Sequence, residues 1–393
     1  MSHYLLTMKP IEHFFFGVEK VGNLGNRKPY YLETTEFPQQ TSILGLLRYV
    51  ILLKEGKLGT NLGADKKVNE LIGSDSFPGN SKTGYGVIKE LSPVFIVENN
   101  NNTAYFTRPL DWQYRFVKKD LGCKVSYGVK IEILDFIPFL DNYKAKEGIH
   151  QYLISSRGHS IPLWYDKKTK EGVLRKQAKS GNQKNPERFL NEEEKKDDKM
   201  TAEAKNEAYY KQEFLYMESK FAYACVVEID DNRLSKETAL KDFKTVVPFG
   251  GERSSFAISF KELDTVSVNQ YHFDLQPQNN YLKIELLSDA FVEQDILSMT
   301  SLAVCDTIGF RNLSTKTTTK NYSRISKDTN HESADLSDQL QLLKRGSVFF
   351  FDSMAKMEEA EELLQKGKEH FTTIGYNKYN KYKLETINNH GTI

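Results

Sequence analysis

The hydrophobic pattern near the start of the chain changes from a strand-like period to a helical one. Residues 4–17, YLLTMKPIEHFFFG, are rich in aromatic side chains and are typical of a strand. After Pro38 the apolar residues recur at helical spacing, and one stripe contains Ile43, Leu44, Leu47, Val50 and Ile51. The pattern therefore predicts a strand, a loop and an amphipathic helix over 37–53.

Short segments with alternating apolar and polar residues continue along the chain and predict half-buried strands. The first group is SPVFIV, AYFTRPLDW, KVSYGVKIEIL and HQYLIS, with a hairpin tip at the asparagine run 99–102. The second group is EFLYMESKFAYACVVEI, SSFAISF, NNYLKIELLSDAF and GSVFFFD. Helices are predicted over 292–304 and 354–370. The window 307–340 is polar and irregular, and the ending TIGYNKYNKY is rich in glycine and tyrosine.

The composition changes between residues 165 and 208. The stretch GVLRKQAKSGNQKNP is basic, and NEEEKKDDKMTAEAKNE is densely charged with almost no apolar residue. Such a segment cannot bury enough apolar surface to fold by itself, so we expect an exposed, mobile and partly helical insertion. Short strands mixed with a few helices predict an α+β fold for the rest.

Composition narrows the function classes. The chain has 393 residues and a net charge of +1, so any nucleic-acid contact must come from local patches. Its three cysteines lie far apart without a CxxC pair, which argues against a disulfide framework or a thiolate zinc site. The start lacks a signal-peptide layout, and no apolar run approaches the length of a membrane helix. We expect a soluble, cytoplasmic protein without membrane contact.

One face of the predicted first helix could admit a phosphate backbone. Thr41, Gly45 and Arg48 lie at i, i+4 and i+7, which makes a small, donor-bearing face with one arginine. The loop before the helix, VEKVGNLGNRKPYY, contains glycine and is basic.

Three later segments are also candidates for contact with a phosphate backbone. Residues 307–327 hold five cations and no acidic residue, with Phe310 and Tyr322 interleaved, which suits single-stranded RNA. A solvated loop is the alternative, and we expect this segment to be mobile in the free protein. The cationic stretch 173–184 is better explained as a solvated insertion. At 250–253, paired glycines before Glu252 and Arg253 allow close backbone approach, or only a tight turn.

Signals of catalysis are few. The chain has no HExxH, GxxxxGK[ST] or GxSxG pattern, and its carboxylate pairs lie in polar runs. His13 could act as a general base in RNA cleavage, although a histidine in such a position is more often structural. The sequence predicts no enzyme, no metal and no cofactor.

The order of these motifs resembles that of RAMP-superfamily subunits of type III CRISPR effectors, specifically subunit three of the Cmr (type III-B) complex. That family opens with an aromatic strand, a loop and a proline-led helix similar to residues 37–48. Its GGE followed by arginine is matched at 250–253, and its glycine–aromatic loop resembles residues 307–315. GSVFFFD at 346–352 and EFLYMES at 213–219 resemble further family segments, and 374–378 matches the closing glycine-rich loop loosely.

The resemblance implies two ferredoxin-like (RRM-like) modules packed together, at 1–212, with the insertion at about 165–208, and at 213–393. It implies a non-catalytic subunit that grips the 5′ tag of crRNA. The implied partners are the large cyclase-like subunit, the first backbone RAMP subunit and target RNA near the tag. The expected RNA-binding residues are Lys20, Arg27, Lys28, Thr41, Ser42, Gly45, Arg48, Gly250, Gly251, Arg253, Arg311, Lys316, Lys320, Arg324, Gly375 and Lys378.

Three alternatives stay open at this point. The first is a RAMP endonuclease that matures crRNA with His13 as its base. The second is the equivalent subunit of a type III-A (Csm) complex. The third is an assembly scaffold without RNA contact. A cleavage assay on repeat RNA separates the enzyme from the binder, and RNA crosslinking in the assembled complex separates the binder from the scaffold.

Overall fold

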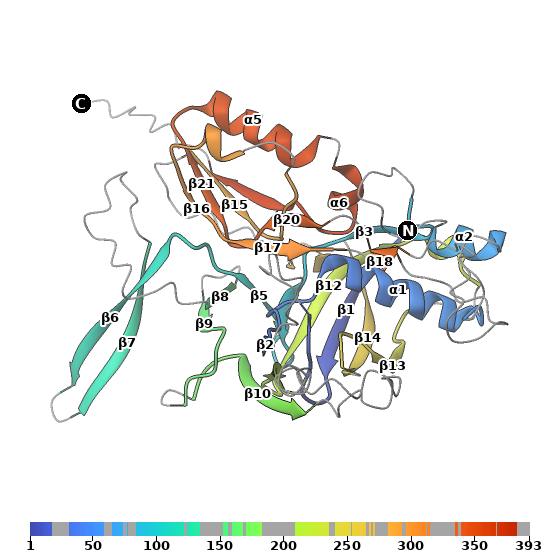
Figure 1. Cartoon of the computed structure of the whole chain (residues 1–393), viewed down its shortest axis with the longest axis horizontal. Helices are drawn as coiled ribbons and strands as arrows, with labels where there is room; N and C mark the ends of the chain where they lie inside the picture. The colour runs from blue at the N-terminus through green and yellow to red at the C-terminus, as the bar shows by residue number, and fades with distance from the viewer. Residues whose placement is uncertain are drawn as a thin grey trace, which may run out of the picture.

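The N-terminal strand lies inside the largest sheet rather than at its edge (Figure 1). In the computed structural model, β1 (Ser2–Pro10) pairs antiparallel with β12 (Phe221–Ile229) on one side and with β14 (Ser255–Leu263) on the other. The structure describes residues 1–17, 31–58, 65–73, 77, 84–121, 124–133, 152–155, 159–167, 170–182, 209–235, 240–252, 254–264, 267–268, 270–271, 282–292, 296–311, 313–314, 335–336, 339–366 and 368–382.

Six further strands extend this sheet on both sides. They are β3 (Ile88–Leu91), β4 (Phe95–Glu98), β5 (Thr103–Thr107), β8 (Tyr152–Ser155), β9 (Ser160–Pro162) and β13 (Lys244–Pro248). The strand order is β13-β14-β1-β12-β4-β5-β8-β9, and β3 also pairs with β12. The predicted hairpin tip at 99–102 is the turn between β4 and β5.

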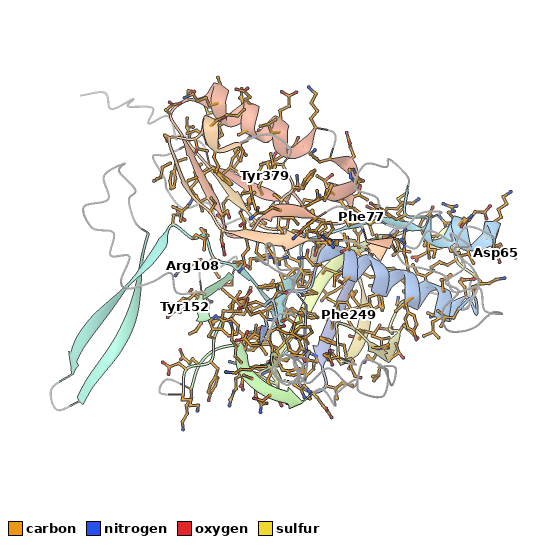
Figure 2. All side chains as sticks on the ribbon, viewed as in Figure 1. Asp65, Phe77, Arg108, Tyr152, Phe249 and Tyr379 are labelled. Atoms are coloured by element: carbon orange, nitrogen blue, oxygen red, sulfur yellow. The ribbon has the colours of Figure 1, made fainter. Side chains whose placement is uncertain are left out.

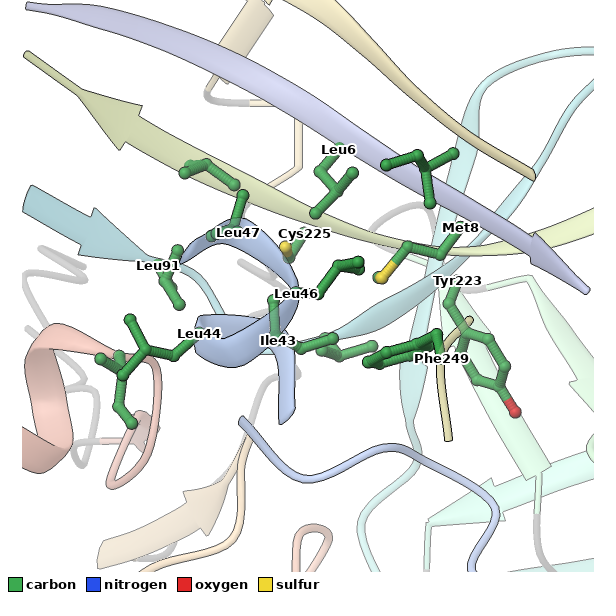
Figure 3. Close-up of a cluster of buried hydrophobic side chains, with 14 of the residues drawn as sticks. Leu6, Met8, Ile43, Leu44, Leu46, Leu47, Leu91, Tyr223, Cys225 and Phe249 are labelled. Carbon is green, nitrogen blue, oxygen red and sulfur yellow. The ribbon is translucent and has the colours of Figure 1, made fainter. Parts of the chain in front are cut away.

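The apolar stripe of the first helix packs on one face of this sheet. α1 (Gln40–Lys54) buries the side chains that the pattern predicts, and Figure 3 shows Leu47 on the side of the helix that faces β12. Each fully buried leucine or isoleucine contributes roughly 1.5–3 kcal/mol. The opposite face of the sheet has its own core, which contains Leu5 and Phe95. α2 (Lys66–Ile72) lies beside α1.

A second, smaller sheet lies toward the C-terminus (Figure 1). Its order is β16 (Leu302–Val304), β21 (Val348–Phe351), β15 (Leu282–Leu286) and β22 (Tyr379–Tyr382), with every pair antiparallel. α5 (Met354–Gln365) packs on it, and α6 (Glu369–Thr373) follows. The chain therefore has the predicted mixture of helices and mostly antiparallel sheets.

Four sheets of two or three strands complete the described part of the chain. The strands β2 (Tyr31–Leu32), β10 (Leu174–Asn182) and β11 (Tyr209–Met217) form a sheet in which β2 and β11 are parallel. β6 (Trp112–Leu121) and β7 (Lys124–Ile133) form a long hairpin that projects away from both sheets (Figure 1). The pairs β17 (Thr307–Phe310) with β20 (Leu340–Leu343), and β18 (Leu313–Ser314) with β19 (Asp335–Leu336), are short.

Some expectations from the sequence need correction. The helix predicted over 292–304 is wrong, because Ile296–Met299 forms a single 3-10 turn and the next apolar residues pair with β21 as β16. The first part of the expected insertion at 165–208 contains the strand β10, and residues 183–208 lie outside the described part of the chain. The tyrosine-rich ending contains β22, and the window expected to be irregular contains β17.

Buried charged side chains join the two sheets. Lys283 on β15 contacts Asp111, just before β6, at 2.8 Å between Nζ and Oδ2, with side chains 1% and 2% exposed. Arg345 donates from Nη1 to the carbonyl of Val94 at 3.0 Å, and its guanidinium lies 4.5 Å from the ring centroid of Phe37. In Figure 2, Arg108 lies near Tyr152, and its guanidinium is 5.3 Å from the tyrosine ring centroid.

No helix among the described residues is both long enough and apolar enough to span a membrane.

Candidate nucleic-acid interface

A groove of about 420 Å³ opens between the start of α1 and the turn after β13. We call it the α1 groove. None of its lining residues is charged, so it offers backbone groups, hydroxyls, amides and ring surfaces. The lining residues are Phe16, Gly17, Thr35, Gln39, Ser42, Gly45, Leu46, Tyr49, Pro248, Phe249, Gly250 and Gly251.

The start of α1, at this groove, lacks a side-chain cap. Gln39 is the N-cap residue, but its side chain makes no capping hydrogen bond, and the first turn has no acidic residue. Its Oε1 instead accepts a hydrogen bond from the Tyr376 hydroxyl at 2.8 Å. The first N–H groups of a helix have no carbonyl partner within it, and the helix dipole places partial positive charge there. This end of α1 therefore favours an anion.

The exposed residues of α1 that line the groove are Ser42, Gly45 and Tyr49, and the buried Leu46 lies beneath them. Ser42 and Gly45 are exposed, and a Cβ added at Gly45 would meet no atom within 4 Å. Tyr49, one turn beyond Gly45, is 37% exposed. Thr41 is half-buried at the flank of this face. The sequence reasoning missed Gln39, Tyr49 and Phe249, although the helical spacing from Gly45 to Tyr49 was visible.

The paired glycines of the β13 turn border the groove, but packing inside the protein already requires them. Gly250 has φ +84°, and a Cβ there would lie 2.7 Å from the carbonyl oxygen of Phe15. Gly251 donates its N–H to that oxygen at 2.8 Å, and its own Cβ would lie 2.8 Å from the Phe15 ring. The structure thus brings Gly250 and Gly251 to the same groove as Ser42 and Gly45.

Gly375 lies beneath the start of α1 rather than in the groove. Its φ is +89°, and a Cβ there would lie 2.0 Å from Nε2 of Gln40. That buried amide donates to the carbonyls of Ser92 at 2.9 Å and Ile374 at 2.7 Å. Its Oε1 accepts from the N–H of Val94 at 3.2 Å. Gly375 therefore positions the helix that forms one wall of the groove.

Three predicted cations lie elsewhere. The guanidinium of Arg48 is 5.7 Å from the ring centroid of Tyr85, on the flank of α1. Arg311 donates from Nη2 to Gln339 at 3.3 Å. Lys378 contacts Glu90 at 2.7 Å in a separate cleft of about 1130 Å³ beside α5. The structure does not bring these three residues into the α1 groove.

Seven predicted cations lie outside the described residues: Lys20, Arg27, Lys28, Arg253, Lys316, Lys320 and Arg324. Two of these segments adjoin groove-lining residues in the sequence. Residues 18–30 follow Gly17, and Arg253 comes two residues after Gly251. Gly17 forms a bridge with Thr34, and the N–H of Phe16 donates to Thr34 Oγ1 at 2.9 Å. These bonds hold Gly17 and Thr34 next to each other.

Among the described residues, the candidate catalytic side chains lie in surroundings that do not favour catalysis. His13 stacks edge-on against Phe214, and its Nε2 lies 3.1 Å from Nζ of Lys179. Burial raises the pKa of the Cys225 thiol to about 12, so the thiol stays protonated at neutral pH. Within the described part of the chain, no group of three or more histidine, cysteine or acidic residues could hold a metal ion.

Comparison with known proteins identifies the family. Residues 6–380 match the family model described as CRISPR-associated protein (Cas_Cmr3). No curated protein sequence matches the chain. The chain is 14% identical to a chain of the type III-B Cmr-beta structure bound to cognate target RNA, with a TM-score of 0.43 and 96% of both chains covered.

Two structures from related complexes are also similar. A chain of the Csm1-Csm4 cassette in complex with AMPPNP is 11% identical, with a TM-score of 0.35, and the match covers 89% of this chain and 88% of that one. A chain of the Csm3-Csm4 subcomplex of the type III-A interference complex is 13% identical, with a TM-score of 0.35, and covers 89% and 93% respectively.

Proposed function

We propose that this chain, which belongs to the Cmr3 family of CRISPR-associated proteins, binds the 5′ tag of crRNA without cleaving it. As a Cmr3-like subunit of the type III-B class, it would also link the large cyclase-like subunit to the first backbone subunit. One observation carries the proposal. Two segments that resemble family motifs, residues 37–48 and 250–253, are far apart in sequence, yet residues from both line the α1 groove.

The chemistry of the groove suits a single-stranded tag. Such a strand has an irregular backbone and splayed bases, which backbone amides, hydroxyls and aromatic rings can contact. The exposed Ser42 hydroxyl supplies a donor, and the exposed ring of Tyr49 supplies a stacking surface. In the sequence, Lys20 and Arg253 follow closely after the lining residues Gly17 and Gly251, and they would supply positive charge.

Gly45→Glu tests the groove. We expect the variant to lose crRNA from the assembled complex, because a carboxylate beside the start of α1 repels phosphate. The repulsion of roughly 1–4 kcal/mol predicts at least a fivefold loss of affinity. The fold should tolerate the change, since the space at Gly45 is open and glutamate favours a helix over glycine by roughly 0.5–1 kcal/mol.

Gly45→Gln is the matched control, because it has the same size without the charge. It should retain crRNA better than Gly45→Glu, and both variants should melt at or above the temperature of the unchanged protein. Equal loss of crRNA in the two variants would assign the effect to bulk. Full retention in Gly45→Glu would exclude the α1 groove as the tag site.

We expect the purified protein to leave repeat RNA intact, with and without divalent metal. His13 contacts a lysine and aromatic rings, and the described residues provide no acid–base pair around it. The measurement is incubation of labelled repeat RNA with the protein and with its His13→Ala variant. Metal-independent cleavage that disappears in His13→Ala would instead favour the maturation endonuclease.

The strand orders support two ferredoxin-like modules. In a βαββαβ module the first and third strands are central neighbours, with the fourth beside the first and the second beside the third. The C-terminal order β22-β15-β21-β16 fits this scheme with α5 as its second helix. The order β14-β1-β12-β4 fits it with α1 as its first helix. On this assignment the first module runs to Leu263 and the second begins at Leu282, later than residue 212, which falls inside β11.

A further inference from the structure

The cationic stretch that the sequence assigned to a solvated insertion forms an ordered strand with a distinct face. In β10, Arg175 pairs with Tyr216 of β11, and Gln177 pairs with Phe214. Directly opposite residues share a face of a sheet, and so do residues two or four positions apart on one strand. Arg175 and Lys179 therefore lie on the same face as Phe214 and Tyr216.

Aromatic rings and cations contact one another along this face. The guanidinium of Arg175 lies 3.6 Å from the ring centroid of Tyr165. Nζ of Lys179 lies 4.9 Å from the centroid of Phe214 and 3.1 Å from Nε2 of His13. The His13 ring is 4.8 Å from that of Phe214 and 5.8 Å from that of Tyr216. We call this set the aromatic–cationic face: His13, Tyr165, Arg175, Lys179, Phe214 and Tyr216.

Exposure divides the face into a floor and a rim. Phe214 is 7% exposed and forms the floor, whereas Tyr216 is 36% exposed. The Arg175 side chain is 48% exposed and pairs with Glu218, which offsets its charge. No described carboxylate forms an ion pair with Lys179. The face thus presents the partly exposed ring of Tyr216 together with Lys179, for which the described residues supply no countercharge.

We propose that the aromatic–cationic face is a second contact surface for single-stranded RNA. Exposed rings bind bases by stacking without regard to sequence, and lysine and arginine beside them neutralise phosphates. Arg175 and Lys179 are about 13 Å apart along the strand, so an RNA running along β10 meets a cation on either side of the rings. This proposal shares one premise with the proposed function, namely that the chain binds RNA.

The face is continuous with the α1 groove. The Phe15 ring lies 6.1 Å from that of Phe214, and Phe15 forms a bridge with Gly251 at the groove. One RNA strand could therefore leave the groove, cross Phe15 and follow β10. In Figure 1, β10 lies on the side of the molecule opposite α5.

The test is binding of a fluorescent oligouridylate, which has no stable structure, to the full chain. Tyr216→Ala should weaken binding by roughly five- to a hundredfold, the range expected when one stacking ring is lost. Tyr216→Phe should keep the affinity, because it keeps the ring. Lys179→Ala should flatten the slope of log K against log salt by roughly 0.7, the value for one phosphate contact on a single strand.

Lys241→Ala is the matched control, because Lys241 is an exposed lysine whose partner is Glu262 and which lies outside both surfaces. It should leave oligouridylate binding unchanged. Failure of the full chain to bind oligouridylate, or equal binding by Tyr216→Ala, would overturn the proposal. Normal RNA binding by Tyr216→Ala with loss of another subunit from the complex would identify a protein-docking surface instead.

The outcomes for the two surfaces are separable. Gly45→Glu reports crRNA retention through the α1 groove, and Tyr216→Ala reports oligouridylate binding through β10 and β11. An effect of Tyr216→Ala without one of Gly45→Glu would support the aromatic–cationic face and reject the tag site. The reverse result would reject the face alone.

Discussion

Replacing Lys283 by alanine will lower the free energy of unfolding by roughly 3–5 kcal/mol. Lys283 and Asp111 form an ion pair at 2.8 Å with almost no exposure. Removing the ammonium leaves the Asp111 carboxylate buried without its counter-charge, which costs far more than the pair itself contributes. The ammonium also lies 4.9 Å from the ring centroid of Tyr382, and that contact disappears as well.

The same variant should change how stability depends on pH, because Glu285 lies nearby on β15. Burial raises the pKa of Glu285 from an ordinary 4.5 to about 7, and Lys283 opposes that rise. Since the folded pKa is the higher one, the contribution of Glu285 to stability is full below pH 4.5 and is lost as the pH rises through 7. Without Lys283 the pKa should rise further, so stability should keep falling above pH 7.

Urea unfolding of both proteins between pH 4 and 9 measures these effects. Lys366→Ala is the matched control, because it breaks the exposed pair of Lys366 with Glu362 at 2.7 Å. Exposed helical pairs contribute about 0.3–0.5 kcal/mol, so the control should be nearly neutral. A Lys283→Ala variant as stable as Lys366→Ala would show that the junction between the sheets tolerates an unpaired Asp111.

Gly375→Ala will destabilise the protein by roughly 3 kcal/mol or more. Alanine at φ +89° is strained, and its Cβ would overlap Nε2 of Gln40 at 2.0 Å and crowd the Ser92 carbonyl at 2.6 Å. Moving the Gln40 side chain aside breaks hydrogen bonds to buried backbone groups. Each group left without a partner costs roughly 1–3 kcal/mol.

Gly45→Ala is the control for this effect, because it makes the same chemical change where the space is open. In a helix it should stabilise the protein by roughly 0.5–1 kcal/mol. Thermal unfolding of both variants measures the contrast. A double variant with Gln40→Ala should be less destabilised than the sum of the two single changes, because the side chain that clashes is gone. Strict additivity would mean that the two residues do not interact.

The spacing of apolar residues was enough to predict those helices and strands that bury one regular face of their own sequence. The stripe of α1 is buried as expected, because the helical spacing of its apolar residues places them on the buried side of the helix. The same holds for β1 and for most of the helix predicted over 354–370, which ends as α5 at Gln365 and is followed by the separate α6. The prediction of a helix over 292–304 was wrong, because the backbone groups of Leu302 and its neighbours form hydrogen bonds with β21, which follows much later in the chain.

The sequence predicted only part of the candidate site, because contacts between residues far apart in the chain decide which residues come together. Gly250 and Gly375 were recognisable as special positions, but sequence spacing does not reveal what a glycine approaches. The structure shows that the partners are the Phe15 carbonyl and the Gln40 amide within the chain. The cationic stretch of β10 looked like a solvated insertion, because its order comes from residue-by-residue pairing with β11 across segment 183–208.

The central position of β1 affects how the protein is made. β1 is synthesised before both of its partner strands, because Ile229, the partner of Ser2, and the whole of β14 emerge roughly 220 to 260 residues later. At about 5–20 residues per second, the ribosome needs on the order of ten to fifty seconds to deliver them. During that time Leu5 and Leu6 have no sheet to join, so nascent chains should depend on a chaperone. A circular permutant that begins near residue 209 would shorten this wait.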